Sequence, residues 1–202
     1  MKILGLDSSG IVASVAIVED ENLIAEYTVN YKKTHSQTLL PMLDELVKMT
    51  ELDLDTIDAI AVAAGPGSFT GLRIGSATAK GLGLALKKPL VEIPTVDALA
   101  YNLYDSRALI CPIMDARRSQ VYTGIYRFQE HKLVTVEAQM AVPMAEMIEK
   151  LNARGEEVVF LGDGVPVFGK MIQENLKVPY SFAPAHVNKQ RAAAVAALGG
   201  IY

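Results

Sequence analysis

Residues 63–83, AAGPGSFTGLRIGSATAKGLG, are the part of the sequence most suited to hold a phosphate. The glycines follow an apolar run and precede a helical pattern, and many phosphate sites are built as strand, glycine loop and helix. A P-loop needs G-x-x-x-x-G-K-[ST], but only three residues separate Gly67 from Gly71 and no lysine follows. A Rossmann fingerprint needs G-x-G-x-x-G, but Thr70 stands at the third glycine. The stretch therefore matches neither phosphate motif.

The same stretch carries a second pattern, a row of small residues at helical spacing. Gly71, Gly75, Ala79 and Gly83 recur every four residues and so share one face of a helix predicted over about 70–87. Each glycine lowers helix stability by about 1 kcal/mol relative to alanine. A face with so little side chain predicts close packing against another backbone, either the protein's own sheet or another subunit. The spacing alone favours the sheet.

Few other residues have side chains that could bind a metal or react. His35, His131 and His186 are far apart in the sequence and have no metal-ligand spacing, which favours surface or capping roles. Cys111 lies in the apolar run ALICPIM and is interpreted as a small buried hydrophobe. One cysteine allows no internal disulfide, which fits a reducing compartment.

Composition limits the classes of function. The 202 residues are 50% hydrophobic with a net charge of −4, and no Lys/Arg run exceeds two residues. A protein that binds nucleic acid unaided usually carries a basic stripe. No signal peptide or membrane-length apolar run is recognised, so a soluble cytoplasmic protein without membrane contact is expected.

The predicted elements form two similar series. Short apolar strands joined by tight turns predict an antiparallel meander in each half, followed by alternating helices and strands. The first half has strands at 2–7, 11–18, 23–29, 58–64 and 90–93, with helices at 36–49, 70–87 and after Thr95, a candidate cap. The second half has strands at 109–114, 120–127, 132–138 and 157–162, with helices near 143–151, 167–176 and from about 188.

A meander followed by α/β units, repeated twice, predicts a duplicated α/β architecture. Two such lobes describe the actin-like ATPase class of folds. The first lobe is expected at 1–105 and a second, reduced lobe at 106–202.

Four motifs together carry a resemblance to a known family. GLDSSG, THSQTLLP, AGPGSFTGLRIG and MDARRSQVY are similar to those of TsaB, a family of bacterial proteins of tRNA threonylcarbamoyladenosine synthesis. The resemblance implies the two-lobed actin-like fold, of the ribonuclease H-like, sugar kinase, Hsp70 and actin class. It also implies a heterodimer with the catalytic paralogue TsaD. With the ATPase TsaE, that complex transfers threonylcarbamoyl to N6 of the tRNA adenosine beside the anticodon.

The resemblance further implies that this chain has no catalytic site of its own. Asp97 and Tyr101 stand where TsaD has two metal-binding histidines, and this pair suits Fe or Zn poorly. Ala116 and Arg117 replace two glycines of a TsaD phosphate loop, which crowds the backbone approach, although an arginine can itself bind phosphate.

The resemblance therefore predicts a vestigial nucleotide cleft. This cleft is expected to hold no metal and no cofactor, and at most to bind an adenine nucleotide weakly. The first loop is largely intact, whereas Asp163-Gly164 is either a remnant loop or a plain β-turn. The candidate cleft residues are Asp7, Ser8, Ser9, Asp115, Arg117, Asp163 and Gly164.

In the TsaB family, the helix after the glycine loop and the helix near Ser36 form the partner surface. The resemblance therefore reverses the preference for the sheet and predicts a TsaD contact on the glycine face. A Gly75→Leu change is expected to block the complex and leave the fold intact. A homodimer through the same surface is expected when TsaD is absent, and tRNA contact is expected only indirectly. The predicted interface residues are Leu39, Met42, Leu43, Leu46, Gly71, Arg73, Gly75 and Ala79.

Three rival functions are less well supported. A kinase or ATPase of the same fold needs a working nucleotide cleft, which Ala116 and Arg117 argue against. A metalloprotease needs metal ligands, and neither H-x-x-x-H nor H-E-x-x-H occurs. A stand-alone RNA-binding module is disfavoured because the net charge of the chain is negative.

Overall fold

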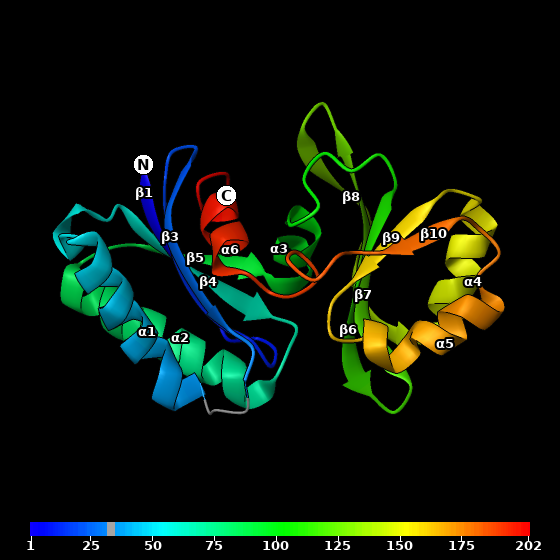
Figure 1. The fold of residues 1–202 in the computed structure, drawn as a ribbon, viewed down its shortest axis with the longest axis horizontal. Coiled ribbons are helices and arrows are strands. Elements are labelled where there is room, and N and C mark those ends of the chain that lie inside the picture. The colour runs from blue at the N-terminus through cyan, green and yellow to red at the C-terminus, as the bar shows by residue number, and fades with distance from the viewer. Residues whose placement is uncertain (32–34) are drawn as a thin grey trace. The chain divides into compact units, whose positions relative to one another are not determined.

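A computed structural model of the chain describes residues 1–31 and 35–202 (Figure 1). Thr34, the first residue of the THSQTLLP motif, therefore lies outside the described residues. The chain divides into two compact units, one of Met1–Ala98 with Gln190–Tyr202 and one of Leu99–Lys189. This division differs from the expected lobes 1–105 and 106–202, because the last segment of the chain packs with the first unit.

The first unit is built on a five-stranded mixed sheet in the order β3-β2-β1-β4-β5. The antiparallel meander predicted for this half is confirmed, and β4 and β5 extend it as parallel strands. The strands are β1 (Lys2–Asp7), β2 (Ala13–Glu19), β3 (Asn22–Val29), β4 (Ala59–Gly65) and β5 (Leu90–Pro94).

Two long helices cover one face of this sheet (Figure 1): α1 (His35–Thr50) and α2 (Phe69–Leu86). The short helix η1 (Leu54–Thr56) precedes β4. Ser68 caps α2 by accepting a hydrogen bond from the Gly71 N–H, as a serine before a helical pattern favours. The helix α3 (Thr95–Tyr101) follows β5, and its Thr95 hydroxyl accepts from the Gly65 N–H.

The helix α6 (Ala192–Gly199) covers the opposite face of the first sheet and contacts β1, β2 and β4. The sequence predicted a start near residue 188, but the helix begins at Ala192. Its residues are small, and Gly5 of β1 lets its backbone come close, since a Cβ on Gly5 would lie 2.3 Å from the Ala192 carbonyl oxygen. The first unit therefore has three layers, helix, sheet and helix.

The second unit has a sheet of the same kind, in the order β10-β9-β6-β7-β8. Its antiparallel meander is also confirmed, with β9 parallel to β6 and β10 parallel to β9. Its elements are β6 (Leu109–Arg117), β7 (Gln120–Gln129), β8 (Lys132–Pro143), α4 (Met144–Arg154), β9 (Val158–Leu161), α5 (Val165–Asn175) and β10 (Tyr180–Phe182).

The sequence missed two short elements, η1 and β10, whose lengths of three residues leave no periodicity to detect. None of the helices in the described ranges combines the length and the apolar character that crossing a membrane requires.

Candidate functional site

The glycine face of α2 packs against the protein's own first loop, which follows β1. A Cβ on Gly71 would lie 2.0 Å from the Ser8 carbonyl oxygen, and one on Gly75 would lie 2.6 Å from the Ser8 hydroxyl. The Ser8 hydroxyl donates to the Gly71 carbonyl oxygen at 2.9 Å. A Cβ on Gly67 would likewise meet the Ser9 carbonyl oxygen. The glycines therefore serve the close approach of the 7–10 loop.

This packing corrects the predicted partner surface. Seven of the eight predicted interface residues lie inside the first unit and not on its surface, because they pack α1 against the sheet and α2 against the sheet and the first loop. From this packing we expect Gly75→Leu to disturb the fold, contrary to the expectation from the sequence, because a larger side chain would displace Ser8. The buried residues are Leu39, Met42, Leu43, Leu46, Gly71, Gly75 and Ala79.

Arg73, the remaining predicted interface residue, lies on the exposed side of α2. Its guanidinium stacks on the Phe69 ring, with 3.8 Å between its central carbon and the ring centroid. Phe69 is 68% exposed and Leu84 is 84% exposed, and Ala77 lies exposed between them. The side of the helix away from the glycine face thus exposes three apolar residues, Phe69, Ala77 and Leu84, interspersed with Arg73 and Lys80, and we call these three residues the apolar stripe.

A groove of about 460 Å³ lies beside the Phe69–Lys80 part of this side of α2. It lies between α2 and the ends of β4 and β5, and Phe69, Arg73, Ala77, Lys80 and Glu92 are among its lining residues. The sequence missed this groove because periodicity shows that a helix has two faces but not which one a sheet will cover.

The first loop holds a deeply buried carboxylate, Asp7. Its Oδ1 accepts hydrogen bonds from the Ser9 N–H at 2.9 Å and the Ser9 hydroxyl at 2.6 Å, while its Oδ2 has no partner among the described residues. Burial raises the pKa of Asp7 to about 6, against the opposing effects of the Ser9 hydrogen bonds and of His35. His35 contacts the Gly10 carbonyl oxygen through Nε2 at 2.8 Å, so it packs against the first loop instead of capping a helix.

Gln190 packs against the same loop, although the sequence analysis did not identify it as a candidate. Its side chain is 1% exposed and lies against Gly10, where a Cβ would be 2.6 Å from the amide nitrogen. Both polar atoms of its amide lack a hydrogen-bond partner in the described part of the chain. A glutamine far along the chain carries no sequence signal for such a position.

In the second unit, the DARRSQ segment forms the tight turn between β6 and β7. Arg117, Arg118 and Ser119 have φ values of 65°, 51° and 61°, all in the left-handed region that favours glycine and asparagine. Each such residue costs about 1 kcal/mol or more. The Asp115 carboxylate accepts from the Arg117 N–H at 2.8 Å and holds the turn.

The Asp163 side chain accepts from the Asp115 N–H at 3.1 Å. Burial raises the pKa of Asp163 above its usual value. Gly164 precedes α5, and the Val165 N–H donates to the Gly162 carbonyl oxygen, so the segment is a β-turn leading into a helix. The structure thus brings Asp115, Arg117 and Asp163 together within the second unit, and Asp7, Ser8 and Ser9 within the first.

Other candidate reactive groups are not assembled into a site. No group of three or more His, Cys, Asp or Glu side chains is placed to hold a metal ion within residues 1–31 and 35–202. Cys111 is fully buried, and burial raises the pKa of its thiol to about 12, so it offers no thiolate.

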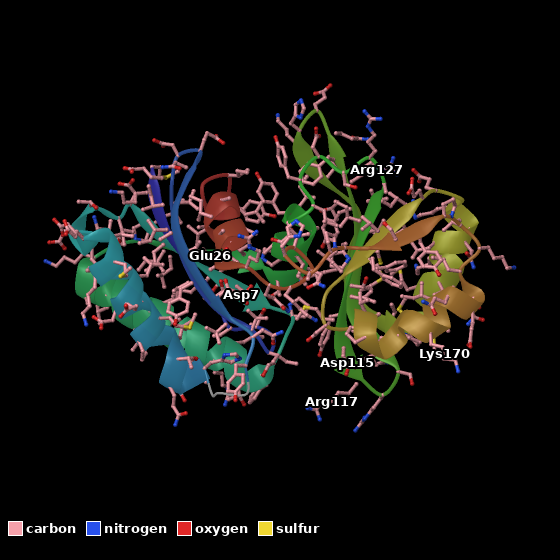
Figure 2. The ribbon with its side chains drawn as sticks, viewed as in Figure 1. Asp7, Glu26, Asp115, Arg117, Arg127 and Lys170 are labelled. Atoms are coloured by element: carbon pink, nitrogen blue, oxygen red, sulfur yellow. The ribbon has the colours of Figure 1, made fainter. Side chains whose placement is uncertain are left out.

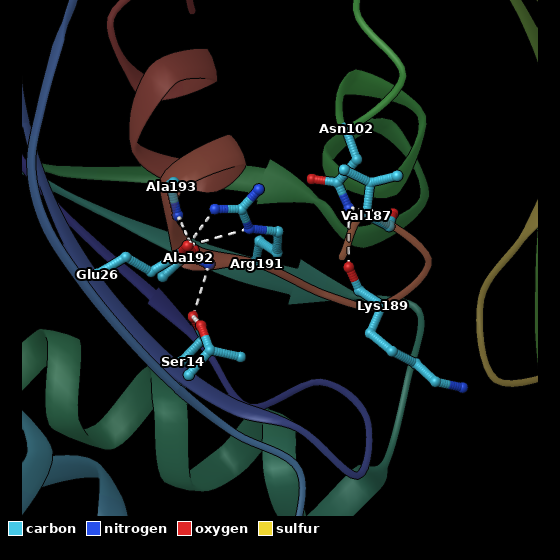
Figure 3. A network of polar contacts seen from close by, with 9 residues as sticks. Ser14, Glu26, Asn102, Val187, Lys189, Arg191, Ala192 and Ala193 are labelled. Carbon is cyan, nitrogen blue, oxygen red and sulfur yellow. Dashed lines mark hydrogen bonds and ion pairs between the residues drawn. The ribbon is translucent and has the colours of Figure 1, made fainter. Parts of the chain in front are cut away.

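A polar network fixes the beginning of α6 (Figure 3). Glu26 of β3 accepts from the Ala193 N–H at 3.1 Å and pairs with Arg191, while the Ser14 hydroxyl accepts from the Ala192 N–H at 2.9 Å. Separately, the Asn102 side-chain amide donates to the carbonyl oxygens of Val187 and Lys189. These side chains form hydrogen bonds with backbone groups at the start of α6 and in the segment 187–189 that precedes it. Their role is therefore structural.

Comparison with known proteins points to one family. The family model described as TsaD: tRNA N6-adenosine threonylcarbamoyltransferase matches residues 22–202. The tRNA threonylcarbamoyladenosine biosynthesis protein TsaB of Bacillus subtilis is 34% identical over 199 residues, which cover 98% of this chain and 87% of the relative. The TsaB of Escherichia coli is 30% identical over 81% of this chain and 72% of the relative.

Solved structures agree with the fold. YeaZ from Pseudomonas aeruginosa is 26% identical and has a TM-score of 0.83, with 99% of this chain and 91% of that chain covered. A ROK hexokinase from Thermus thermophilus has a TM-score of 0.52 at 11% identity, with 100% of this chain and 98% of that chain covered, which shows the fold alone. The predicted two-lobed α/β fold of the actin-like and sugar kinase class is thereby confirmed.

Proposed function

The chain belongs to the TsaB family of tRNA threonylcarbamoyladenosine biosynthesis proteins, and we propose that it is the non-catalytic subunit that binds and activates TsaD. In this role it supports threonylcarbamoyl transfer to tRNA by the complex with TsaE. In this proposal the chain contributes a binding surface for TsaD and catalyses no step itself.

The observation that carries the proposal is the exposed apolar stripe of α2. Phe69, Ala77 and Leu84 are exposed along one side of an 18-residue helix, and Phe69 and Ala77 also line the groove. Exposed apolar residues of this size along one helix face are typical of a protein interface. We therefore place the TsaD contact on this stripe, where Arg73 and Lys80 lie among the apolar residues, and not on the glycine face.

The phosphate loops support the absence of catalysis. Gln190 packs against Gly10 of the first loop, and Arg117 occupies a position where a glycine would let a phosphate approach the backbone. The Asp7 carboxylate is buried and already accepts two hydrogen bonds from Ser9. These contacts argue against tight nucleotide binding, and weak adenine nucleotide binding stays the alternative function.

Light scattering of the purified chain, alone and mixed with TsaD, tests the proposal. The wild-type chain should form a heterodimer, and Leu84→Asp should prevent it because a charge would be buried in the apolar contact. Since Leu84 is 84% exposed, the variant should fold normally. Val167→Asp is the matched control, because Val167 is 56% exposed on α5 of the other unit.

The possible outcomes distinguish a wrongly assigned interface from a wrongly proposed subunit role. If Leu84→Asp binds TsaD as the wild type does, the stripe is not the interface. If the wild-type chain fails to bind TsaD and instead turns over ATP, the subunit role itself is wrong. If the isolated chain forms a homodimer, Leu84→Asp should also make it monomeric, because a two-fold contact would use the same surface.

A further inference from the structure

We propose that Arg117 and Arg118, at the tip of the β6–β7 hairpin, bind phosphates of the RNA backbone. The inference rests on the proposed function, in which the complex acts on tRNA. It adds a direct contact between this subunit and RNA, where the sequence predicted only indirect contact. Figure 2 shows the Arg117 side chain extending outward from the hairpin tip.

The two guanidinium groups are available. Both side chains are exposed, and within the described ranges neither guanidinium makes an ion pair or a hydrogen bond. The sequence has two other basic doublets. Lys32-Lys33 lies outside the described residues, and in Lys87-Lys88 the Lys88 ammonium donates to the Asp55 carbonyl oxygen. Arg117-Arg118 is therefore a doublet whose charges are not used within the fold.

The turn that carries the arginines is held in place by its own backbone contacts. Asp115 accepts from the Arg117 N–H, Asp163 accepts from the Asp115 N–H, and the Ser119 carbonyl oxygen accepts from the Met144 N–H. The two nearby carboxylates therefore fix the backbone and do not form ion pairs with the guanidinium groups. Lys189 adds a further positive charge near Asp163.

The backbone conformation points to a role for the side chains. Three consecutive residues are left-handed, and glycine or asparagine would satisfy this conformation with less strain. A sequence that instead places two arginines there retains a strained turn in exchange for two adjacent guanidinium groups. Strain of this kind is a reason to look for function at the tip.

The chemistry of the tip favours a polymer of phosphates over a single nucleotide. Guanidinium groups bind phosphate oxygens through paired N–H donors. A free nucleotide is usually buried in a pocket, whereas contacts to an RNA backbone are commonly made by exposed arginines. Because the chain is acidic overall, with a net charge of −4, two arginines can add to RNA binding by a complex but not replace a basic partner.

The test is tRNA binding by the assembled complex at several salt concentrations. For R117Q/R118Q, the magnitude of the slope of log affinity against log salt should fall by about 1.4–1.8, or about 0.7–0.9 for each lost phosphate contact. R117K/R118K keeps both charges and should keep the slope. The control K132Q/K170Q removes two exposed charges elsewhere in the second unit, including Lys170 on α5 (Figure 2), and should leave the slope unchanged.

Each result has a definite meaning. An unchanged slope for R117Q/R118Q, in a complex that forms and binds tRNA, overturns the inference and leaves the proposed function intact. Failure of the wild-type chain to join the complex would instead be failure of the proposed function. Calorimetry with ATP and inorganic triphosphate tests the other source of phosphate: binding that the double variant loses, with an unchanged tRNA slope, would assign the arginines to a free ligand and overturn the RNA site.

Discussion

Asp7 shows at the scale of one residue what burial does to a charge. Its carboxylate is fully buried, and one of its oxygens has no partner among the described residues. The folded protein therefore binds a proton at Asp7 more tightly than the unfolded chain does. Its pKa of about 6, against an ordinary value of 3.8, means that the contribution of Asp7 protonation to stability is fully present below about pH 4 and is lost as the pH rises through 6.

Replacing Asp7 with asparagine should remove this pH dependence. The amide stays neutral and its oxygen can still accept from Ser9, so Asp7→Asn should raise the free energy of unfolding at pH 7.5 by up to about 3 kcal/mol. The difference from the wild type should vanish near pH 4. Denaturant unfolding across this range measures it, with exposed Asp55→Asn as the control. Parallel pH curves for wild type and Asp7→Asn would contradict the buried charge.

At the scale of an element, α2 shows what sequence spacing can and cannot predict. The four-residue repeat from Gly71 to Gly83 placed these residues correctly on one buried face. It could not identify the partner, because a loop of the same chain and a second subunit demand the same small residues. Only the three-dimensional course of the 7–10 loop decides between them, and that course depends on β1, which is distant in sequence.

Two glycines of α2 provide a matched test of this packing. A methyl group on Gly71 would meet the Ser8 backbone, so Gly71→Ala should lower the free energy of unfolding by about 1–3 kcal/mol. A methyl group on Gly81 would meet nothing within 4 Å. Gly81→Ala should instead raise the free energy of unfolding by about 0.5–1 kcal/mol through helix propensity. Thermal or denaturant unfolding measures both, and equal effects would show that Gly71 is not in close contact.

At the scale of the molecule, the repeated meanders predicted most of the architecture. Local alternation and turn signals are enough to define two sheets, and both formed with the expected antiparallel pairs. The return of α6 to the first unit was not predictable, because AAAVAALG is apolar on every side and so carries no information about which sheet it covers. The capping contacts that hold it, from Ser14 and Glu26, span more than 160 residues of sequence.

The close contact between Gly5 and α6 predicts that the stability of the first unit depends on the packing of α6 against β1. A Cβ on Gly5 would lie 2.3 Å from the Ala192 carbonyl oxygen and 2.9 Å from the Ala196 Cβ, so Gly5→Val should push α6 away from β1. The first unit should lose about 3 kcal/mol or more of stability. Hydrogen exchange should show faster exchange in β1, β2 and α6 and unchanged protection in β6 and β9, which belong to the other unit.

The control for this prediction is Gly169→Val in α5, where an added Cβ meets nothing within 4 Å and no loss of protection is expected. If Gly5→Val leaves the exchange of α6 unchanged, the helix does not depend on the face of β1. If protection falls equally in both units, the chain unfolds as one cooperative body and the separation at Ala98 and Gln190 has no energetic meaning. Selective loss in the first unit is expected, because α6 supplies one of its three layers, and among the described residues none of α6 belongs to the core cluster of the second unit.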